Sequence, residues 1–116
     1  MDQEPKRIVV DQQGDCTIIR FRDKDILDQV NIHEMGEEMY AVVEGSPGIN
    51  LVVDFDGVLY LSSSALGKLI SLKRKVEENS GTIKMCRIKP EIMEVFRITK
   101  LDTIFDIRPD LEAALT

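Results

Sequence analysis

Residues 49–70 read INLVVDFDGVLYLSSSALGKLI, an apolar run that ends in three consecutive serines. The first part, residues 49–55, is almost continuously β-branched or apolar, which is typical of a central strand covered on both faces. After the serines, apolar residues recur at helical spacing, which predicts a helix with one buried face. These residues are Ala65, Leu66, Leu69, Leu72 and Val76. The segment therefore predicts a buried strand, a serine-containing loop and a helix.

The flanking segments repeat this alternation of strands and helices. Residues 7–21 carry two β-rich stretches around Gly14, which is a hairpin pattern, and residues 82–88 alternate like a strand. Asn31 followed by Glu34 has the spacing of a capping box, so we expect a helix that begins at Asn31 and ends before Gly45. Two proline-plus-acid pairs, at residues 90–91 and 109–110, mark further helix starts, with a short strand within residues 101–107.

The predicted element order is β-β-α-β-α-β-α-β-α. Alternating strands and helices imply parallel neighbours joined by crossovers, and the opening hairpin adds an antiparallel pair. The fold class is therefore α/β, with a mixed sheet of about four to five strands and about four helices. The 116 residues suffice for one core, and no linker or repeat divides them, so we expect a single domain over residues 1–116.

Charge and composition exclude several functional classes. A net charge of −6 argues against nucleic-acid binding, which needs a basic footprint. No apolar run is long enough to span a membrane, and the polar start MDQEPKR lacks a signal peptide's apolar stretch, so we expect a cytoplasmic protein. Cys16 and Cys86 could pair, but reduced thiols are the expectation. One histidine and two separated cysteines form no ligand cluster, so we expect no metal and no cofactor.

The serine triplet, residues 62–64, lies where open α/β sheets place their sites, at the carboxyl end of a central strand. A serine hydroxyl there can cap the following helix. Alternatively, it can carry a phosphoryl group, because the free N–H groups of a helix start stabilise anions. One cap uses only one hydroxyl, so helix stability leaves two of the serines unexplained.

An enzymatic role for these serines finds little support in the sequence. The nucleophile motif G-x-S-x-G is not met, because the flanking residues are Leu61 and Ala65. The only histidine, His33, falls on the charged face of its predicted helix. We also expect Asp54 and Asp56, on either side of a phenylalanine, not to face one pocket as a catalytic pair. The sequence therefore predicts a binding protein and not an enzyme.

The stretch DFDGVLYLSSSALGKLI, residues 54–70, closely resembles the signature of STAS domains, the anti-sigma factor antagonists of bacteria. Ser63, Ser64, Leu66 and Gly67 match that motif. The segment GTIKMCRIKPEIMEVFRITKLDTIF, residues 81–105, and the element order also fit. The resemblance covers nearly the entire chain and implies a STAS fold.

The resemblance also implies a phosphorylation switch. The unmodified antagonist binds an anti-sigma factor, itself a serine kinase, and thereby releases the sigma factor. The kinase then phosphorylates Ser63, with Ser62 and Ser64 as alternative acceptors, and a serine phosphatase resets the cycle. The implied partner-binding residues are Asp28, Asn31, Ser62, Ser63, Ser64, Ala65, Leu66 and Gly67.

Two positions depart from the family pattern. The family carries an acidic residue before the phosphoserine and a glycine after the serine pair, where this chain has Ser62 and Ala65. These departures keep a second function open. In that alternative, the protein is a STAS scaffold, or a module that senses a small ligand or nucleotide in a signalling complex, and it takes no phosphate.

Overall fold

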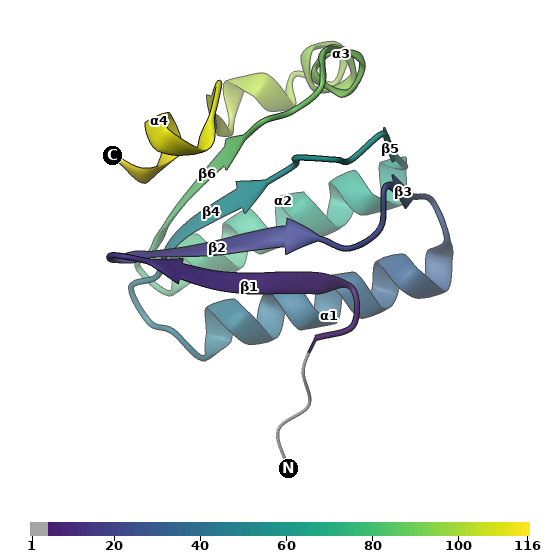
Figure 1. Cartoon of the computed structure of the whole chain (residues 1–116). Helices are drawn as coiled ribbons and strands as arrows, with labels where there is room; N and C mark the ends of the chain where they lie inside the picture. The colour runs from purple at the N-terminus through teal and green to yellow at the C-terminus, as the bar shows by residue number, and fades with distance from the viewer. Residues whose placement is uncertain (1–4) are drawn as a thin grey trace.

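The computed structural model describes residues 5–116, so residues 1–4 of the polar start lie outside it. Its main sheet has five strands in the order β1-β2-β4-β6-β7. The first two strands pair antiparallel, and the remaining pairs are parallel (Figure 1). The α/β class with a mixed sheet is therefore confirmed. The strands are β1 (Ile8–Gln13), β2 (Cys16–Phe21), β4 (Asn50–Asp54), β6 (Thr82–Cys86) and β7 (Asp106–Arg108).

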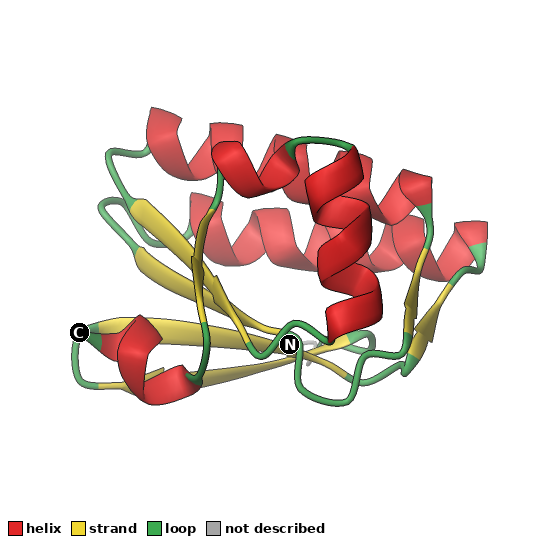
Figure 2. Ribbon diagram, turned by 90° about the horizontal axis from the view of Figure 1, so that it is seen from above, coloured by secondary structure: helices red, strands yellow, loops and turns green. Residues whose placement is uncertain are grey.

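Helices cover both faces of this sheet. Two long helices lie side by side on one face, and the short terminal helix lies on the other (Figures 1 and 2). A further helix follows β6 and lies beyond its carboxyl end (Figure 1). The helices are α1 (Gln29–Glu44), α2 (Ser63–Glu78), α3 (Pro90–Ile98) and α4 (Leu111–Leu115), with a 3₁₀ turn, η1 (Leu101–Thr103).

The main core forms between the sheet and the two long helices. Leu51 and Val53 of β4 point into it, together with the whole predicted apolar stripe of α2. On α1, Ile32, Met35, Met39 and Val43 are buried in the same core, and Val42 is partly covered. The helical spacing of apolar residues therefore identified the buried residues of α2 correctly.

All four phenylalanines lie in or against this core, in one row that runs from the carboxyl ends of β2 and β4 to the residue before β7. The ring of Phe55 is 5.3 Å from Phe21 and 6.2 Å from Phe96, whose ring is in turn 6.2 Å from Phe105. Tilted and edge-on contacts at these distances are favourable for aromatic rings. The row anchors the chain immediately after β4, before it reaches the serines.

The opposite face of the sheet is covered by α4. Ile18, Val52 and Cys86, from the three central strands, pack there against Ala114. This second, smaller core explains why β4 is apolar at successive positions, because both faces of the strand are covered.

Two glycines meet specific backbone requirements. Gly14 has a φ of +58° in the turn between β1 and β2, as the hairpin pattern predicts. A Cβ on Gly81, just before β6, would collide with the carbonyl oxygen of Ile49. That close approach joins the turn after α2 to the start of β4.

The structure corrects three local predictions. Helix α1 begins at Gln29, two residues earlier than the predicted cap Asn31. Within the predicted final strand, the chain first forms η1, and only β7 is extended. A small parallel sheet, β3 (Asp25–Ile26) with β5 (Tyr60–Leu61), was not predicted, because two-residue strands are too short to show a period.

Candidate functional site at the start of helix α2

Ser62 is the cap of helix α2. Its hydroxyl accepts a hydrogen bond from the Ala65 N–H at 3.2 Å, and its carbonyl accepts one from the Leu66 N–H at 3.1 Å. Serine is among the preferred residues at this position because it satisfies an N–H group that the helix leaves free. The expected capping serine is therefore present, and it is Ser62.

The two serines that follow differ in how their hydroxyls are used. Ser64 accepts a hydrogen bond from the side-chain amide of Gln29, the first residue of α1, at 3.0 Å. Ser63 is exposed, whereas Ser62 and Ser64 are half-buried. Within residues 5–116, no group forms a hydrogen bond with the Ser63 hydroxyl. Of the three hydroxyls, only that of Ser63 is both accessible and uncommitted.

Helix α1 starts beside these serines and is capped by Asp28. The Asp28 carboxylate accepts the Asn31 N–H at 3.0 Å, so Asn31 lies inside the first turn. The predicted capping box beginning at Asn31 is therefore wrong. Asp and Asn are about equally good helix caps. Asp28 has the required spacing, because the N–H that it accepts belongs to Asn31, three residues later. The Gln29–Ser64 bond shows that the two helix starts adjoin, which brings Asp28 and Asn31 to the serines.

Not every predicted contact residue can present its side chain to a partner. Ala65 is 0% exposed and Leu66 is 6% exposed, because both belong to the buried stripe of α2. The prediction that these two side chains contact a partner is therefore corrected, because both lie on the buried face of α2. Gly67 is exposed, and a Cβ there would meet no atom within 4 Å, so nothing within the described chain requires glycine. The exposed or half-buried residues around the two helix starts form what we name the serine surface: Asp28, Asn31, Ser62, Ser63, Ser64 and Gly67.

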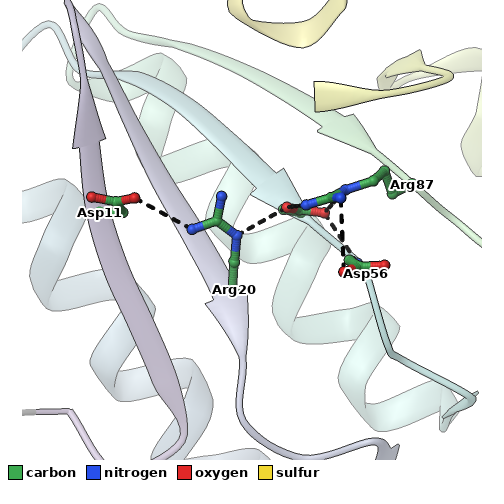
Figure 3. A network of polar contacts seen from close by, with 5 residues as sticks. Asp11, Arg20, Asp56 and Arg87 are labelled. Atoms are coloured by element: carbon green, nitrogen blue, oxygen red, sulfur yellow. Dashed lines mark hydrogen bonds and ion pairs between the residues drawn. The ribbon is translucent and has the colours of Figure 1, made fainter. Parts of the chain in front are cut away.

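A second polar cluster, not predicted from the sequence, lies at the end of the same strand, on the α4 side of the sheet (Figure 3). Asp54 is 0% exposed and accepts hydrogen bonds from Arg20 at 3.1 Å and from Arg87 at 3.0 Å. Arg20 also contacts Asp11, and Arg87 lies 3.7 Å from Asp56. We name these five residues the Asp54 cluster.

The Asp54 cluster overturns the prediction that the carboxylates of Asp54 and Asp56 point in different directions. Asp54 and Asp56 are two residues apart, and Arg87 reaches both, so they share one side of the chain after all. Asp54 ends β4 and Asp56 lies in the turn that follows, where its N–H donates to the Asp54 carboxylate at 3.0 Å. Burial alone would raise the pKa of Asp54, but hydrogen bonds from Arg87, the Asp56 N–H and Arg20 bring it below its ordinary value. The cluster is therefore a set of ion pairs and not a proton-sharing pair of acids.

The two cysteines are free, and each lies on the α4 side of the sheet. Burial, together with the charge of Asp54, raises the pKa of Cys86 to about 12. A thiol with that pKa stays protonated at neutral pH and is a poor nucleophile. Within residues 5–116, no three histidine, cysteine or acidic side chains gather where they could hold a metal ion. No helix in the same range is long and apolar enough to cross a membrane.

Comparisons with known proteins agree with this architecture. BtrV of Bordetella bronchiseptica, named as an anti-sigma factor antagonist, is 26% identical over 89 residues, which cover 77% of this chain and 76% of BtrV. The fold matches an anti-sigma factor antagonist (STAS) domain protein from Planctomyces limnophilus with a TM-score of 0.84 at 22% identity, over 93% of this chain and 95% of that one. The Bacillus cell fate determinant SpoIIAA, solved in a phosphorylated form, matches with a TM-score of 0.67 at 17% identity, over 91% and 95%.

The family assignment follows from the match to the family itself. The family model of the STAS domain matches residues 7–114, which include every strand and nearly all of α4. BtrV and the Planctomyces limnophilus protein are both named anti-sigma factor antagonists, so the resemblance to that family is confirmed. The chain belongs to the STAS domain family and is of the anti-sigma factor antagonist type.

Proposed function

We propose that this protein is a binding switch that docks on an anti-sigma factor through the serine surface and is released when Ser63 is phosphorylated. The partner is an anti-sigma factor with serine kinase activity, and docking frees the sigma factor that it holds. One observation carries the proposal. Ser62 caps α2 and Ser64 binds Gln29, so Ser63 alone presents a free, exposed hydroxyl.

A phosphate on Ser63 would change charge far more than shape. It adds about −1.5 to −2 charges and three strong acceptor oxygens. Ser63 is the first residue of α2, where N–H groups without helical partners and the positive end of the helix dipole favour an anion. The phosphorylated helix start would therefore stay folded. A docked partner would have to desolvate the phosphate, which costs far more than covering a hydroxyl.

The serine surface also has the composition of a contact site. Val30 is 69% exposed and Tyr60 is 60% exposed, and they belong to the segments that carry Asp28 and the serines. Exposed apolar and aromatic side chains beside a few polar groups are typical of interface cores. Gly67, which the fold itself does not require, leaves room for a partner's side chain over the second turn of α2.

The geometry explains the departure at position 62. Because Ser62 is a helix cap, its role can be filled by serine or by the acidic residue found in the family, since both accept the N3 N–H. The substitution therefore preserves the local structure of the loop. It also removes a negative charge beside Ser63. In this protein, the serine triplet is therefore uncharged until a phosphate is added.

The test measures binding to the anti-sigma factor kinase of the same organism. Ser63→Ala should bind with the affinity of the unmodified protein in the presence of ATP, whereas Ser63→Asp should bind about 100-fold more weakly because it buries a charge. Ser80→Asp is the matched control, since it adds the same charge at the opposite end of α2, where φ is already positive and Asp is tolerated. Equal binding by Ser63→Ala and Ser63→Asp would contradict the proposal.

A further inference from the structure

A groove lies between strand β5 and helix α3, next to the serines. It has a volume of about 370 Å³, and its lining is mainly apolar. Figures 1 and 2 both show β5 on the side of the small sheet that faces α3. Leu61 forms part of the lining and is followed directly by the cap Ser62. The lining residues are Leu59, Tyr60, Leu61, Lys89, Glu91, Ile92 and Val95.

The wall formed by β5 has an open backbone edge. The N–H groups of Tyr60 and Ser62 donate to carbonyls of Lys24 and Ile26, on the β3 side. In a parallel pair, alternate residues direct their N–H and C=O groups to the neighbouring strand. Leu61 therefore directs its N–H and C=O away from β3, to the side where α3 lies. An unpaired edge of this kind is a template for another extended segment.

The side chains of the groove indicate what would fill it. Tyr60 is 60% exposed, and Leu59 and Val95 are each 37% exposed, so three large apolar side chains remain only partly covered. The two charged residues, Lys89 and Glu91, are of opposite sign, which favours neither an anion nor a cation. A helix satisfies its own backbone groups, so it could not use the Leu61 edge. An extended segment with an apolar side chain uses both features.

We propose that the β5–α3 groove binds an extended, apolar segment of the partner protein by adding it to the edge of β5. The described ends of this chain lie elsewhere, since the Lys6 N–H bonds Glu38 on α1 and the Thr116 carbonyl accepts from Lys84 on β6. The groove adjoins the serine surface, so the segment belongs to the same partner. Only the assignment of the segment to this partner rests on the proposed function. The segment adds affinity that does not depend on the charge of Ser63.

The test uses a display library of random ten-residue peptides selected on the full chain. Selected peptides should lose about tenfold or more of their affinity for Val95→Glu, because the variant places a carboxylate in the groove. Ile98→Glu is the control, since Ile98 lies on the same helix, is 76% exposed and does not line the groove. Bound peptide should also slow hydrogen exchange of the Leu61 amide about tenfold or more, because that amide becomes a hydrogen-bond donor.

Three results would overturn the groove proposal. The library yields no binding peptide, Val95→Glu and Ile98→Glu bind the peptides equally, or the Leu61 amide exchanges at the same rate with and without peptide. The outcome of the Ser63 binding test is independent of these three results. A protein whose Ser63 variants behave as proposed, but whose groove selects nothing, loses only the groove proposal. A protein that binds peptides but shows equal partner binding by Ser63→Ala and Ser63→Asp loses only the proposed switch.

Discussion

Two polar clusters follow the central strand β4, and they use their hydrogen-bonding groups in opposite ways. At the end of the strand, buried Asp54 is surrounded by donors from Arg20, Arg87 and the Asp56 N–H. A few residues later, Ser63 leaves its hydroxyl exposed and without a partner within residues 5–116. Groups committed inside the protein contribute to stability, whereas an uncommitted exposed group is available to another molecule. The Asp54 cluster should therefore matter for folding, and Ser63 for regulation.

The largest expected effect on stability comes from removing the buried acid. Asp54→Ala should lower the free energy of unfolding by about 3 kcal/mol, because it leaves two arginines without their shared partner. Asp11→Ala removes an outer, half-exposed member of the same cluster, 3.4 Å from Arg20, and should cost less than about 1 kcal/mol. Urea denaturation measures both. Equal losses would show that burial of Asp54 does not set the strength of the cluster.

Acid should weaken the same cluster. The pKa of Asp54 in the folded protein lies below its ordinary value, so its contribution to stability is present above the unfolded pKa. That contribution is lost as the pH falls through the lower, folded pKa, at pH values below about 4. Urea midpoints measured between neutral pH and this range should show the difference between wild type and Asp54→Ala shrinking. A difference that stays constant with pH would contradict the ion-pair assignment.

The sequence predicted the backbone around these clusters better than the clusters themselves. Residues 49–55 form a nearly continuous apolar run and the stripe of α2 recurs at helical spacing, and both patterns report burial directly. The Asp54 cluster could not be predicted, because Arg20, Asp54 and Arg87 become neighbours only once the strand order is known. Asp28 and Asn31 are both good caps within one short segment, so local preference alone could not choose between them.

A smaller effect should separate the capping serine, Ser62, from the proposed phosphate acceptor, Ser63. Ser62→Ala should lower the free energy of unfolding by about 1 kcal/mol, because the Ala65 N–H loses its partner. Ser63→Ala should change it by less than about 0.5 kcal/mol, since the Ser63 hydroxyl binds no group within residues 5–116. Thermal unfolding of the two variants gives the comparison. A larger loss for Ser63→Ala than for Ser62→Ala would reverse the assignment of their roles.

The smallest predicted effect concerns the bond that joins the two helix starts. In a double-mutant cycle, Gln29→Ala and Ser64→Ala should show a coupling of about 0.5 kcal/mol, the net value of one partly exposed hydrogen bond. Unfolding of the two single variants and the double variant measures this coupling. Strictly additive losses would mean that Ser64 is free in solution, and it would then rival Ser63 as a phosphate acceptor.

The most direct test exposes the chain to the anti-sigma factor kinase and ATP and then measures its intact mass. Wild type, Ser62→Ala and Ser64→Ala should each gain the mass of one phosphoryl group, whereas Ser63→Ala should gain none, because Ser63 carries the only uncommitted hydroxyl of the three. Phosphate uptake by Ser63→Ala equal to that of wild type would contradict the account. An unchanged mass for wild type itself would also contradict it and would support the STAS scaffold instead.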